Sequence, residues 1–369
     1  MKTFRIKEIC HLEKGKQIDT TLLNDCNPYK YINGGIKESG YYSAYNTEGE
    51  AVLVSEGGAS CGYVNYINEK FWCGCHCYKL TKCKFLPKYI YYALKGNQEK
   101  LMALRTGAAM PNIKKTTFQD MELCLNENPA EQEMVIKELD KIQIALDIKE
   151  TELIALDDLV KSRFIEMFGT FPSNEHSWDT GTIRDIVTDV KYGSSRKAAT
   201  GNNGKYPYLR MNNITYDGHL DLSDVKTIDI PDNEVEKCSV RYGDILFNRT
   251  NSRELVGKTC VYNRNELMIL AGFIIRVRVN ERIIPEFLSA FLNMDFSKQM
   301  LFGMCKKAIG QANINAQEMQ SIGIYIPPIE LQNEFAEFVK LTDKSKFIVQ
   351  KQIEDLQELL DSKMDEYFG

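Results

Sequence analysis

The sequence predicts an α/β protein in which two globular modules alternate with two long helices. Two observations support this fold class. A helical stretch in the middle of the chain recurs at its end, and the segment before each copy has the same order of strand, loop and helix signals. Such self-similarity indicates an internal tandem repeat. We expect four segments: a first module at 1–128, a central helix at 129–169, a second module at 170–328 and a C-terminal helix at 329–369.

The two helical copies align without a gap from 132–169 to 332–369. The residues of the first copy that recur at the same place in the second are Gln132, Ile148, Leu156, Leu159, Ser162, Glu166, Phe168 and Gly169. In both copies, steps of three and four residues pass mainly through apolar side chains, and no Pro or internal Gly interrupts the pattern. Each copy is therefore predicted to be a continuous amphipathic helix, roughly 57 Å long. Because helices of this length need a partner, we expect the two to pair as a coiled coil. Two unrelated core helices are the alternative, which the gapless alignment disfavours.

The net charge of −5 is unevenly distributed along the chain. Each long helix carries a clear acidic excess, whereas the first module is mildly basic and the second is close to neutral. Acidic helices would not lie against phosphate but could dock a basic protein. The positive charge of the modules is too small for strong unaided phosphate binding, so a DNA ligand would require a partner that contributes more.

The composition indicates a folded protein, with 43% hydrophobic and 26% charged residues among 369. The sequence contains no apolar run near 18 residues, and its first ten residues have no signal-peptide pattern. We therefore expect no membrane association. The odd number of cysteines, 11, together with the missing export signal, points to the reducing cytoplasm.

The first module contains two glycine-rich turns that follow predicted strands. One turn has Asn33, Gly34 and Gly35 after an apolar strand, and the other continues from a strand at 51–55 into Glu56-Gly57-Gly58-Ala59-Ser60. Glycine allows the backbone to approach a ligand closely. The second turn lacks the Gly-Lys-Ser/Thr ending of a phosphate-binding loop, so it does not indicate a nucleotide site. A tight turn without a ligand is the alternative. A helix at 87–104 and a strand at 118–125 are predicted to complete the module.

A cysteine-rich stretch in the first module resembles a metal site only superficially. Cys73, Cys75 and Cys77 alternate with a period of two, and His76 lies among them. On a strand, this alternation places the three cysteines on one face and His76 on the other. Structural zinc sites use a different spacing, and cysteine also packs as a small buried hydrophobe. We expect packing and no metal.

The second module repeats this order with a basic loop, Lys191 to Lys197, and a predicted helix at 285–301. Its loops are rich in side chains that can read bases, since Arg binds guanine and Asn binds adenine bidentately. These side chains are Arg210, Asn212, Asn213, Arg249, Asn251 and Arg253. Ordinary turn residues and surface charge are the alternative, because most protein–DNA contacts go to phosphate and sugar.

No catalytic set is evident in the sequence. Asn27-Pro28-Tyr29 lacks the second proline of an amino-methyltransferase motif, and no glycine-rich cofactor loop follows a strand. The four histidines are scattered and have no partnered nucleophile. We therefore expect a non-catalytic protein without a cofactor, which disfavours a complete methyltransferase.

The arrangement resembles the specificity subunit of type I restriction–modification systems, over the full chain. The resemblance rests on Tyr31 to Ile36, on Ser55 to Ser60, on Gly243 to Ser252 with Val256 to Lys258, and on both helices with their Phe-Gly ends. It implies two target-recognition domains held in pseudo-twofold orientation by an antiparallel pair of helices. Each domain would read half of a bipartite, asymmetric double-stranded DNA target, and the helices would fix the gap between the halves. Two methyltransferase subunits, which flip the target adenine, and restriction/translocase subunits would be the protein partners.

By position, the resemblance indicates candidate DNA-side residues in both modules. They are Asn33, Gly34, Gly35, Glu56, Gly57, Gly58, Ser60, Lys191, Ser194, Arg196, Arg210, Asn212, Arg249, Asn251, Ser252 and Lys258. The candidate partner-docking positions on the helices are Leu139, Leu156, Phe168, Val339, Leu356 and Phe368. Two other functions stay open: the specificity subunit of a type IIB-like restriction system, and a coiled-coil adaptor that does not read DNA.

Overall fold

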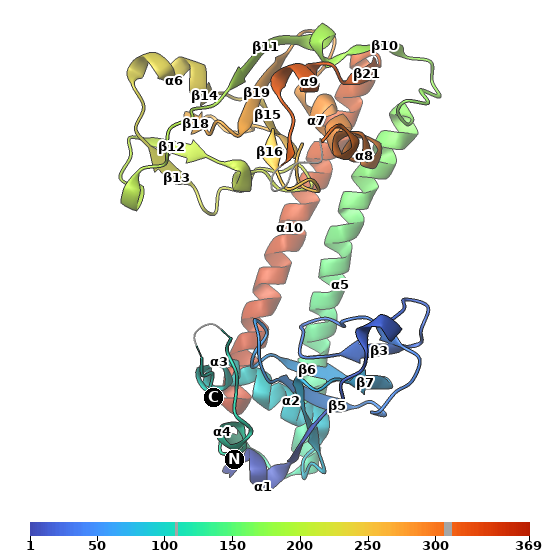
Figure 1. Ribbon diagram of the computed structural model, residues 1–369, viewed down its shortest axis with the longest axis vertical. Helices are drawn as coiled ribbons and strands as arrows, with labels where there is room; N and C mark the ends of the chain where they lie inside the picture. The colour runs from blue at the N-terminus through green and yellow to red at the C-terminus, as the bar shows by residue number, and fades with distance from the viewer. Residues whose placement is uncertain (108–109, 306–311) are drawn as a thin grey trace. The chain divides into compact units, whose positions relative to one another are not determined.

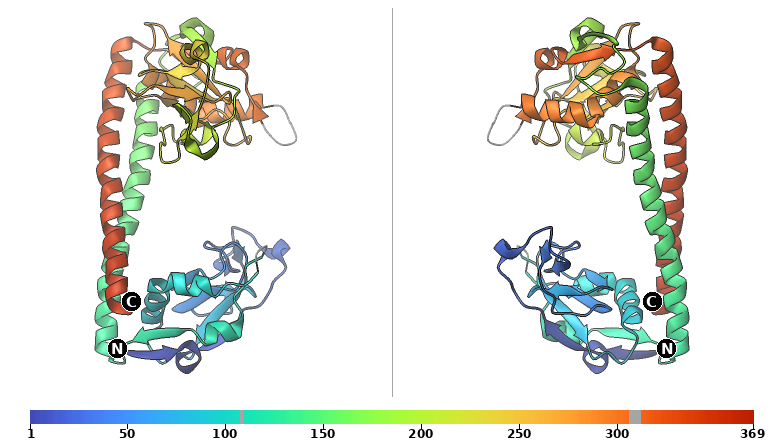
Figure 2. Two further views of the ribbon diagram at one scale, coloured as in Figure 1. Left: turned by 90° about the vertical axis from the view of Figure 1, so that its left-hand side faces the viewer. Right: turned by 90° about the vertical axis from the view of Figure 1, so that its right-hand side faces the viewer.

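The computed structural model describes residues 1–107, 110–305 and 312–369 (Figure 1). The chain forms two compact units, residues 1–151 with 349–369 (unit 1) and residues 152–348 (unit 2). The long helices α5 (Pro129–Phe168) and α10 (Ile329–Phe368) contribute residues to both units. In the two side views, the strands and short helices of each unit lie against that unit's own segments of α5 and α10 (Figure 2).

Unit 1 is built on an antiparallel sheet in the order β2–β8–β5–β6. Its strands are β2 (His11–Lys14), β8 (Cys77–Thr81), β5 (Ala51–Ser55) and β6 (Val64–Ile67). A three-stranded sheet, β4–β3–β7, adds β4 (Tyr41–Tyr42), β3 (Tyr29–Ile32) and β7 (Phe71–Cys73), and β1 (Lys2–Arg5) pairs with β9 (Glu122–Leu125). β5 is paired on both edges, and all five of its residues are buried.

The short helices of unit 1 differ from the sequence-based prediction in two places. The helices are α1 (Ile6–Ile9), α2 (Pro87–Gly96), α3 (Gln98–Ala103) and α4 (Lys115–Gln119), with a 3₁₀ turn at Thr20–Leu22. The predicted helix at 87–104 is interrupted at Asn97, whose buried amide donates to the carbonyls of Ala93 and Phe368. The predicted strand at 118–125 is wrong in its first half, because α4 turns Phe118 into the core before β9 begins.

Unit 2 contains two four-stranded sheets. The first, in the order β11–β19–β15–β17, has β11 (Val187–Tyr192), β19 (Ile274–Val279), β15 (Ile245–Asn248) and β17 (Thr259–Val261). The second, in the order β13–β12–β18–β14, has β13 (Lys226–Ile228), β12 (Tyr206–Leu209), β18 (Met268–Leu270) and β14 (Ser239–Val240). Two short pairs are β10 (Asp179–Thr182) with β21 (Gly323–Ile326) and β16 (Thr250–Asn251) with β20 (Ala312–Asn313).

The helices of unit 2 include α6 (Asp232–Cys238), α7 (Pro285–Asn293), α8 (Asp295–Met304) and α9 (Ala316–Gln320). Short 3₁₀ turns lie at Ile183–Ile186, Thr200–Asn202 and Met211–Asn213. The predicted single helix at 285–301 is two helices, because Met294 has an extended backbone with φ −65° and ψ 151°. Asp295 then begins α8, where an acidic residue is favourable.

The apolar seam expected along the two long helices is covered in both. None of the positions reached by the three- and four-residue steps, from Leu139 to Met167 and from Val339 to Tyr367, is exposed. In unit 1, Glu138 of α5 lies 3.1 Å from Lys363 of α10. In unit 2, Arg163 of α5 lies 2.9 Å from Glu334 of α10. The helices therefore contact each other in both units.

Within the described parts of the chain, no helix is both long and apolar enough to cross a membrane.

Candidate nucleic-acid interface

In unit 1, the loops that follow β3 and β5 lie next to the turn between β7 and β8. The Ser55 hydroxyl donates a hydrogen bond of 2.7 Å to the carbonyl of Gly34, and the backbone N–H of His76 donates one of 3.2 Å to the Asn33 side chain. A Cβ atom on Gly34, whose φ is +89°, would lie 2.9 Å from the carbonyl oxygen of His76. This close approach therefore requires glycine. The structure brings the two predicted glycine-rich loops of this unit together.

The carboxylate of Glu56 is used inside this loop cluster. It lies 2.6 Å from Nζ of Lys14 and accepts a hydrogen bond of 3.0 Å from the Tyr78 hydroxyl. Burial, followed by this carboxylate, raises the pKa of Tyr78 well above its usual value. Because its charge is already paired, Glu56 holds the loop in place, whereas its neighbours Gly57 and Ser60 remain half-exposed.

The cysteine-rich stretch does not form the continuous strand that the alternation predicted. β7 ends at Cys73, the chain turns through Gly74, and β8 begins at Cys77. Gly74 passes close to Asn33 in this turn: a Cβ atom there would lie 2.2 Å from the Asn33 side-chain oxygen, so only glycine fits. Cys73 and Cys77 are buried, and the half-exposed Cys75 lies 3.0 Å from the Gln17 side-chain oxygen. The three cysteines therefore do not share one face of a strand.

In unit 2, Arg249 follows β15 and contacts the last residues of β11 and β20 and the turn before β19. Its guanidinium lies 4.8 Å from the ring centre of Tyr192, and its Nη2 donates a hydrogen bond of 3.0 Å to the side chain of Asn313. Its backbone N–H donates to the carbonyl of Phe273, whose ring is exposed. Stacking on an aromatic ring restricts a guanidinium without neutralising its charge. The Arg249 guanidinium is therefore fixed in position and keeps its positive charge for a further hydrogen-bond acceptor.

A second guanidinium–aromatic pair lies in the same region. Arg253 stands 3.8 Å from the ring centre of Phe302, and its Nε donates to the carbonyl of Phe302. Sequence reasoning selected Arg253 but not Tyr192, Phe273 or Phe302. Spacing along the chain could not reveal these contacts, because the aromatic residues come from three separate segments.

The other predicted basic residues of unit 2 are engaged within the unit. Arg196 makes two hydrogen bonds to Glu234, and Arg210 lies 2.8 Å from Asp224. Lys258 is buried, donates to the carbonyl of Met211, and has its pKa lowered by burial. These three cations stabilise loops, and their charges are less available than that of Arg249.

The remaining candidates of unit 2 vary in exposure. Asn212 is exposed, and Lys191 is exposed beside Asp189 at 3.4 Å. Ser194 is buried, and its hydroxyl accepts a hydrogen bond from the backbone of Arg196. Asn251 and Ser252 are half-exposed, with the Asn251 oxygen accepting from the Ser252 N–H.

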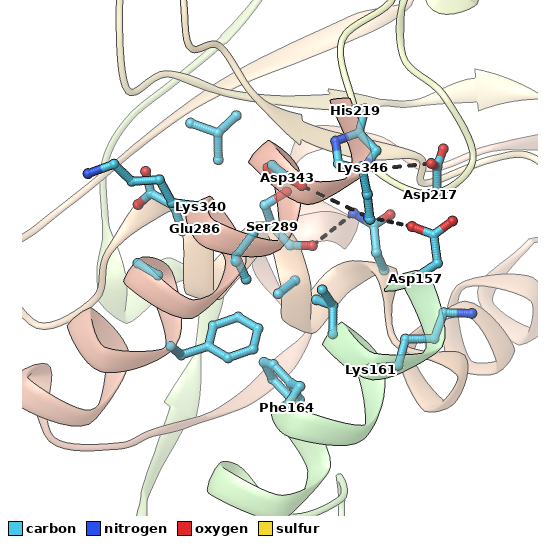
Figure 3. Close-up of a pocket in the computed structure, with 18 of the residues that line it drawn as sticks. Asp157, Lys161, Phe164, Asp217, His219, Glu286, Ser289, Lys340, Asp343 and Lys346 are labelled. Atoms are coloured by element: carbon cyan, nitrogen blue, oxygen red, sulfur yellow. Dashed lines mark hydrogen bonds and ion pairs between the residues drawn. The ribbon is translucent and has the colours of Figure 1, made fainter. Parts of the chain in front are cut away.

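Unit 2 also contains a cavity of about 1050 Å³ that the sequence did not indicate. It lies between α5, α7, α10 and the loop 216–220, and the rings of Phe164 and Phe335 form part of its wall. Figure 3 shows Lys346 of α10 reaching the side chains of Asp157 and Asp343 and the loop residue His219. Lys346 makes an ion pair with Asp157, lies 3.9 Å from Asp343 and is 3.4 Å from Nε2 of His219. No sequence signal marks this cavity, because its lining residues are spread over almost 200 positions.

Three side chains beside Lys346 could in principle bind a metal ion. Asp157, Asp217 and His219 each offer one metal-ligand atom, and these atoms all lie within 4.8 Å of one another. Burial raises the pKa of Asp217. The hydrogen bond from Thr215 and the charges of His219 and Lys346 outweigh burial, so that the pKa of Asp217 lies below its usual value. The Lys346 ammonium contacts two members of this group. A cationic side chain of the chain itself therefore balances the acidic residues.

The six helix positions expected to dock partners face inward. Leu139, Phe168 and Phe368 are buried in the cores of their units, and Leu156, Val339 and Leu356 are half-buried. Buried or half-buried side chains offer little surface to a partner, so docking through these six positions stays a prediction.

Comparisons with known proteins agree on one family. Residues 1–157 and 175–358 match the family described as the type I restriction modification DNA specificity domain. A putative type I specificity subunit of Mycoplasma genitalium is 27% identical over 263 residues, which cover 67% of this chain and 68% of that protein. The EcoKI type I restriction enzyme specificity subunit of Escherichia coli K12 is 23% identical over 290 residues, which cover 74% of this chain and 61% of that protein.

Two solved structures share the fold. The crystal structure of the S subunit of a type I restriction-modification system from M. genitalium has a TM-score of 0.60 at 22% identity, and covers 100% of this chain and 96% of that one. A chain from a study of complex assembly and conformational transition of the type I system has a TM-score of 0.58 at 14% identity, with 99% and 97% covered. The family match spans most of both modules and parts of both long helices, and the chain therefore belongs to the type I restriction-modification DNA specificity family.

Proposed function

We propose that this chain is the DNA sequence-specificity subunit of a type I restriction–modification complex and reads a bipartite, asymmetric double-stranded target. The observation that carries the proposal is the family match, which covers residues of both modules. Residues 1–128 and 170–328 would be the two target-recognition domains, each reading one half-site. Two readers on a rigid support specify two half-sites at a fixed spacing.

A tandem repeat is supported by hydrogen bonds that recur in the two units. In unit 1, the N–H of Ser55 donates to the carbonyl of Tyr63, and the N–H of Gly62 donates back to the carbonyl of Ser55. In unit 2, Asn248 bonds in the same way to Lys258 and Gly257. The loops after β5 and β15 are thus built alike, although their sequences differ.

Antiparallel pairing of the long helices is supported by the order of their contacts. Within unit 2, Asp157 pairs with Lys346, whereas Arg163, further along α5, pairs with Glu334, which lies earlier in α10. Together with the covered seam, this order favours an antiparallel coiled coil that would act as the spacer between the half-sites.

The candidate DNA contacts fall into two groups according to their present partners. Among the described residues, no carboxylate makes an ion pair with Arg249 or Arg253, whose guanidinium groups lie beside aromatic rings, and Asn212 is exposed. These residues fit base or phosphate contacts. Glu56, Arg196 and Arg210 would instead position the loops, because each is paired with an opposite charge.

We place the docking surface for methyltransferase subunits on apolar side chains that both helices expose. Ile148 and Ile348 are 58% and 57% exposed, and Leu159 and Leu359 are 48% and 45% exposed. These four are two of the identical pairs of the helical repeat. Two repeated surfaces of this kind fit two copies of one partner. The restriction/translocase subunits would join through that complex, and the chemistry would belong to the partners.

The test is methylation-sensitive sequencing of DNA from cells that carry the neighbouring methyltransferase, with and without this chain. An interrupted, asymmetric methyladenine motif that depends on the chain is expected. Methylation coupled to cutting outside the site would favour a type IIB-like system. A folded complex with the methyltransferase that produces no new methylation would favour the adaptor function and contradict the proposal.

A further inference from the structure

Two cysteines of unit 1 lie in direct contact at the edge of its core. Cys10 follows α1 and is buried, whereas Cys83 lies in the turn after β8 and is half-exposed. The distance between their Sγ atoms is 3.0 Å, and the Cys10 thiol donates a hydrogen bond to the Cys83 sulfur. A disulfide would require these atoms to approach by only about 1 Å more.

The backbone around both cysteines is already fixed in a geometry that brings them together. His11 pairs with Thr81 in the antiparallel β2–β8 ladder, next to Cys10. On the other side, the N–H of Lys84 donates a hydrogen bond of 2.9 Å to the carbonyl of Ile9. These bonds bracket the cysteine pair, so a covalent bond would need side-chain rotation and not rearrangement of the strands.

The two thiols have different environments, which assigns them different roles. Cys83 is half-exposed, and the hydrogen bond from Cys10 lowers its pKa. The same hydrogen bond, followed by burial, raises the pKa of Cys10. The thiolate is the reactive form of cysteine. Cys83 is therefore the accessible nucleophile, and Cys10 is the thiol that keeps its proton.

We propose that Cys83 and Cys10 form an oxidation site for hydrogen peroxide, in which Cys83 reacts first and Cys10 closes a disulfide. The Cys83 thiolate attacks one peroxide oxygen, the O–O bond breaks, and hydroxide leaves, which gives a sulfenic acid on Cys83. The Cys10 sulfur then attacks the Cys83 sulfur and loses its proton, and the sulfenic hydroxyl leaves as water. In sum, two thiols are oxidised and one peroxide is reduced to two waters.

The disulfide would enclose most of the unit 1 sheet in one covalent loop. β2, β3, β5, β7 and β8 all lie between residues 10 and 83 of the chain. Closing a loop of this length restricts the unfolded chain strongly. The oxidised protein is therefore expected to unfold at a higher temperature. This inference stands independently of the function proposed above.

The test uses the full-length reduced chain, treated with stoichiometric hydrogen peroxide, blocked with iodoacetamide and digested with trypsin. The expected product is a disulfide between the peptide 8–14, which carries Cys10, and the dipeptide 83–84, with a loss of two mass units from the intact chain. Cys26, which is exposed, reports non-selective oxidation. First formation of another disulfide, or oxidation of Cys26 at the same rate, would overturn the proposal.

Two conservative variants separate the roles of the cysteines. In Cys10→Ser, the sulfenic acid on Cys83 has no resolving thiol, so trapping by dimedone should rise several-fold above that of the wild-type protein. In Cys83→Ser, Cys10 should stay reduced, and peroxide should no longer raise the unfolding temperature. Equal dimedone labelling of Cys83 in the wild type and in Cys10→Ser would contradict the assigned sequence of steps.

Discussion

Gln132 and Gln332 make corresponding hydrogen bonds in the two units. The side-chain oxygen of Gln132 accepts from the N–H of Leu86, immediately before α2, and that of Gln332 accepts from the N–H of Ile284, immediately before α7. Their amide groups donate to backbone carbonyls of the chain that leads into the long helix, at Asn126 and Pro327 respectively. Each glutamine thus joins three segments of its own unit, which explains why this residue is identical in both helical copies.

Replacing either glutamine by alanine should destabilise the unit that contains it. Gln332→Ala leaves the N–H of Ile284 without its acceptor in a partly buried place and should reduce the free energy of unfolding by about 1–3 kcal/mol. Urea unfolding measures the change. Gln350→Ala is the matched control, since Gln350 is exposed on the same helix. An equal and small effect of both substitutions would contradict the role of Gln332.

Lengthening the helix pair should change the spacing of the DNA target without changing its half-sites. Four residues inserted after Lys149 of α5, and four after Lys351 in the facing part of α10, add roughly 6 Å, or about two base-pair steps. Methylation-sensitive sequencing should therefore show the same two half-sites with a different gap. The insertion in α5 alone should abolish methylation, because it breaks the register of the pair. An unaltered gap in the double insertion would rule out the spacer function.

Exchange of the second module should alter one half of the target. When residues 170–327 are replaced by the corresponding module of another family member, one half-site should change and the other should persist. The control is the reciprocal exchange of residues 1–128, which should change the other half. A change in both halves after a single exchange would show that the modules do not read DNA independently.

Removing the repeated apolar side chains should weaken methyltransferase binding and leave stability almost unchanged. Ile148→Ser with Ile348→Ser is expected to lower the affinity for the methyltransferase by about tenfold or more, because a well-packed residue at the centre of an interface costs more than about 1 kcal/mol when truncated. Isothermal titration calorimetry with the methyltransferase measures the effect. Ile154→Ser is the control, since Ile154 is 63% exposed but corresponds to Glu354 in the other copy. If the control weakens binding as much, the docking surface is elsewhere.

Unit 2 should become more stable between about pH 8 and pH 10.5 because of Lys298. Burial, together with the charges of Lys258 and Lys161, lowers the pKa of Lys298 from 10.5 to about 8. The unfolded chain then binds more protons than the folded one in this window, so stability rises with pH there. The contribution is at most about 3 kcal/mol. Lys298→Met should be more stable than the wild type at pH 7, and the difference between them should shrink towards pH 10.5. A constant difference would mean that Lys298 has an ordinary pKa when folded.

The long helices and the strands with a strong local pattern could be predicted from the amino-acid sequence alone. The three- and four-residue spacing from Leu139 to Met167 defines one face of a helix, and an uninterrupted pattern of this kind needs no tertiary information. The apolar run at β5 was likewise predicted with its observed ends. The family could also be recognised from the sequence, because the order of two modules and two matched helices with Phe-Gly ends is visible along the chain.

Whether a predicted side chain can contact a ligand depends on its neighbours in the folded protein. Glu56 and Arg249 both follow a central strand, but Glu56 is neutralised by Lys14, whereas Arg249 stacks on Tyr192. Leu139 and Ile148 are both apolar residues of α5, yet one is buried and the other is exposed. Partners of this kind come from segments far apart in the chain, and their effect depends on distance in space. Sequence periodicity does not give distances between remote segments. Composition and spacing could therefore identify candidate residues but not the role of each one.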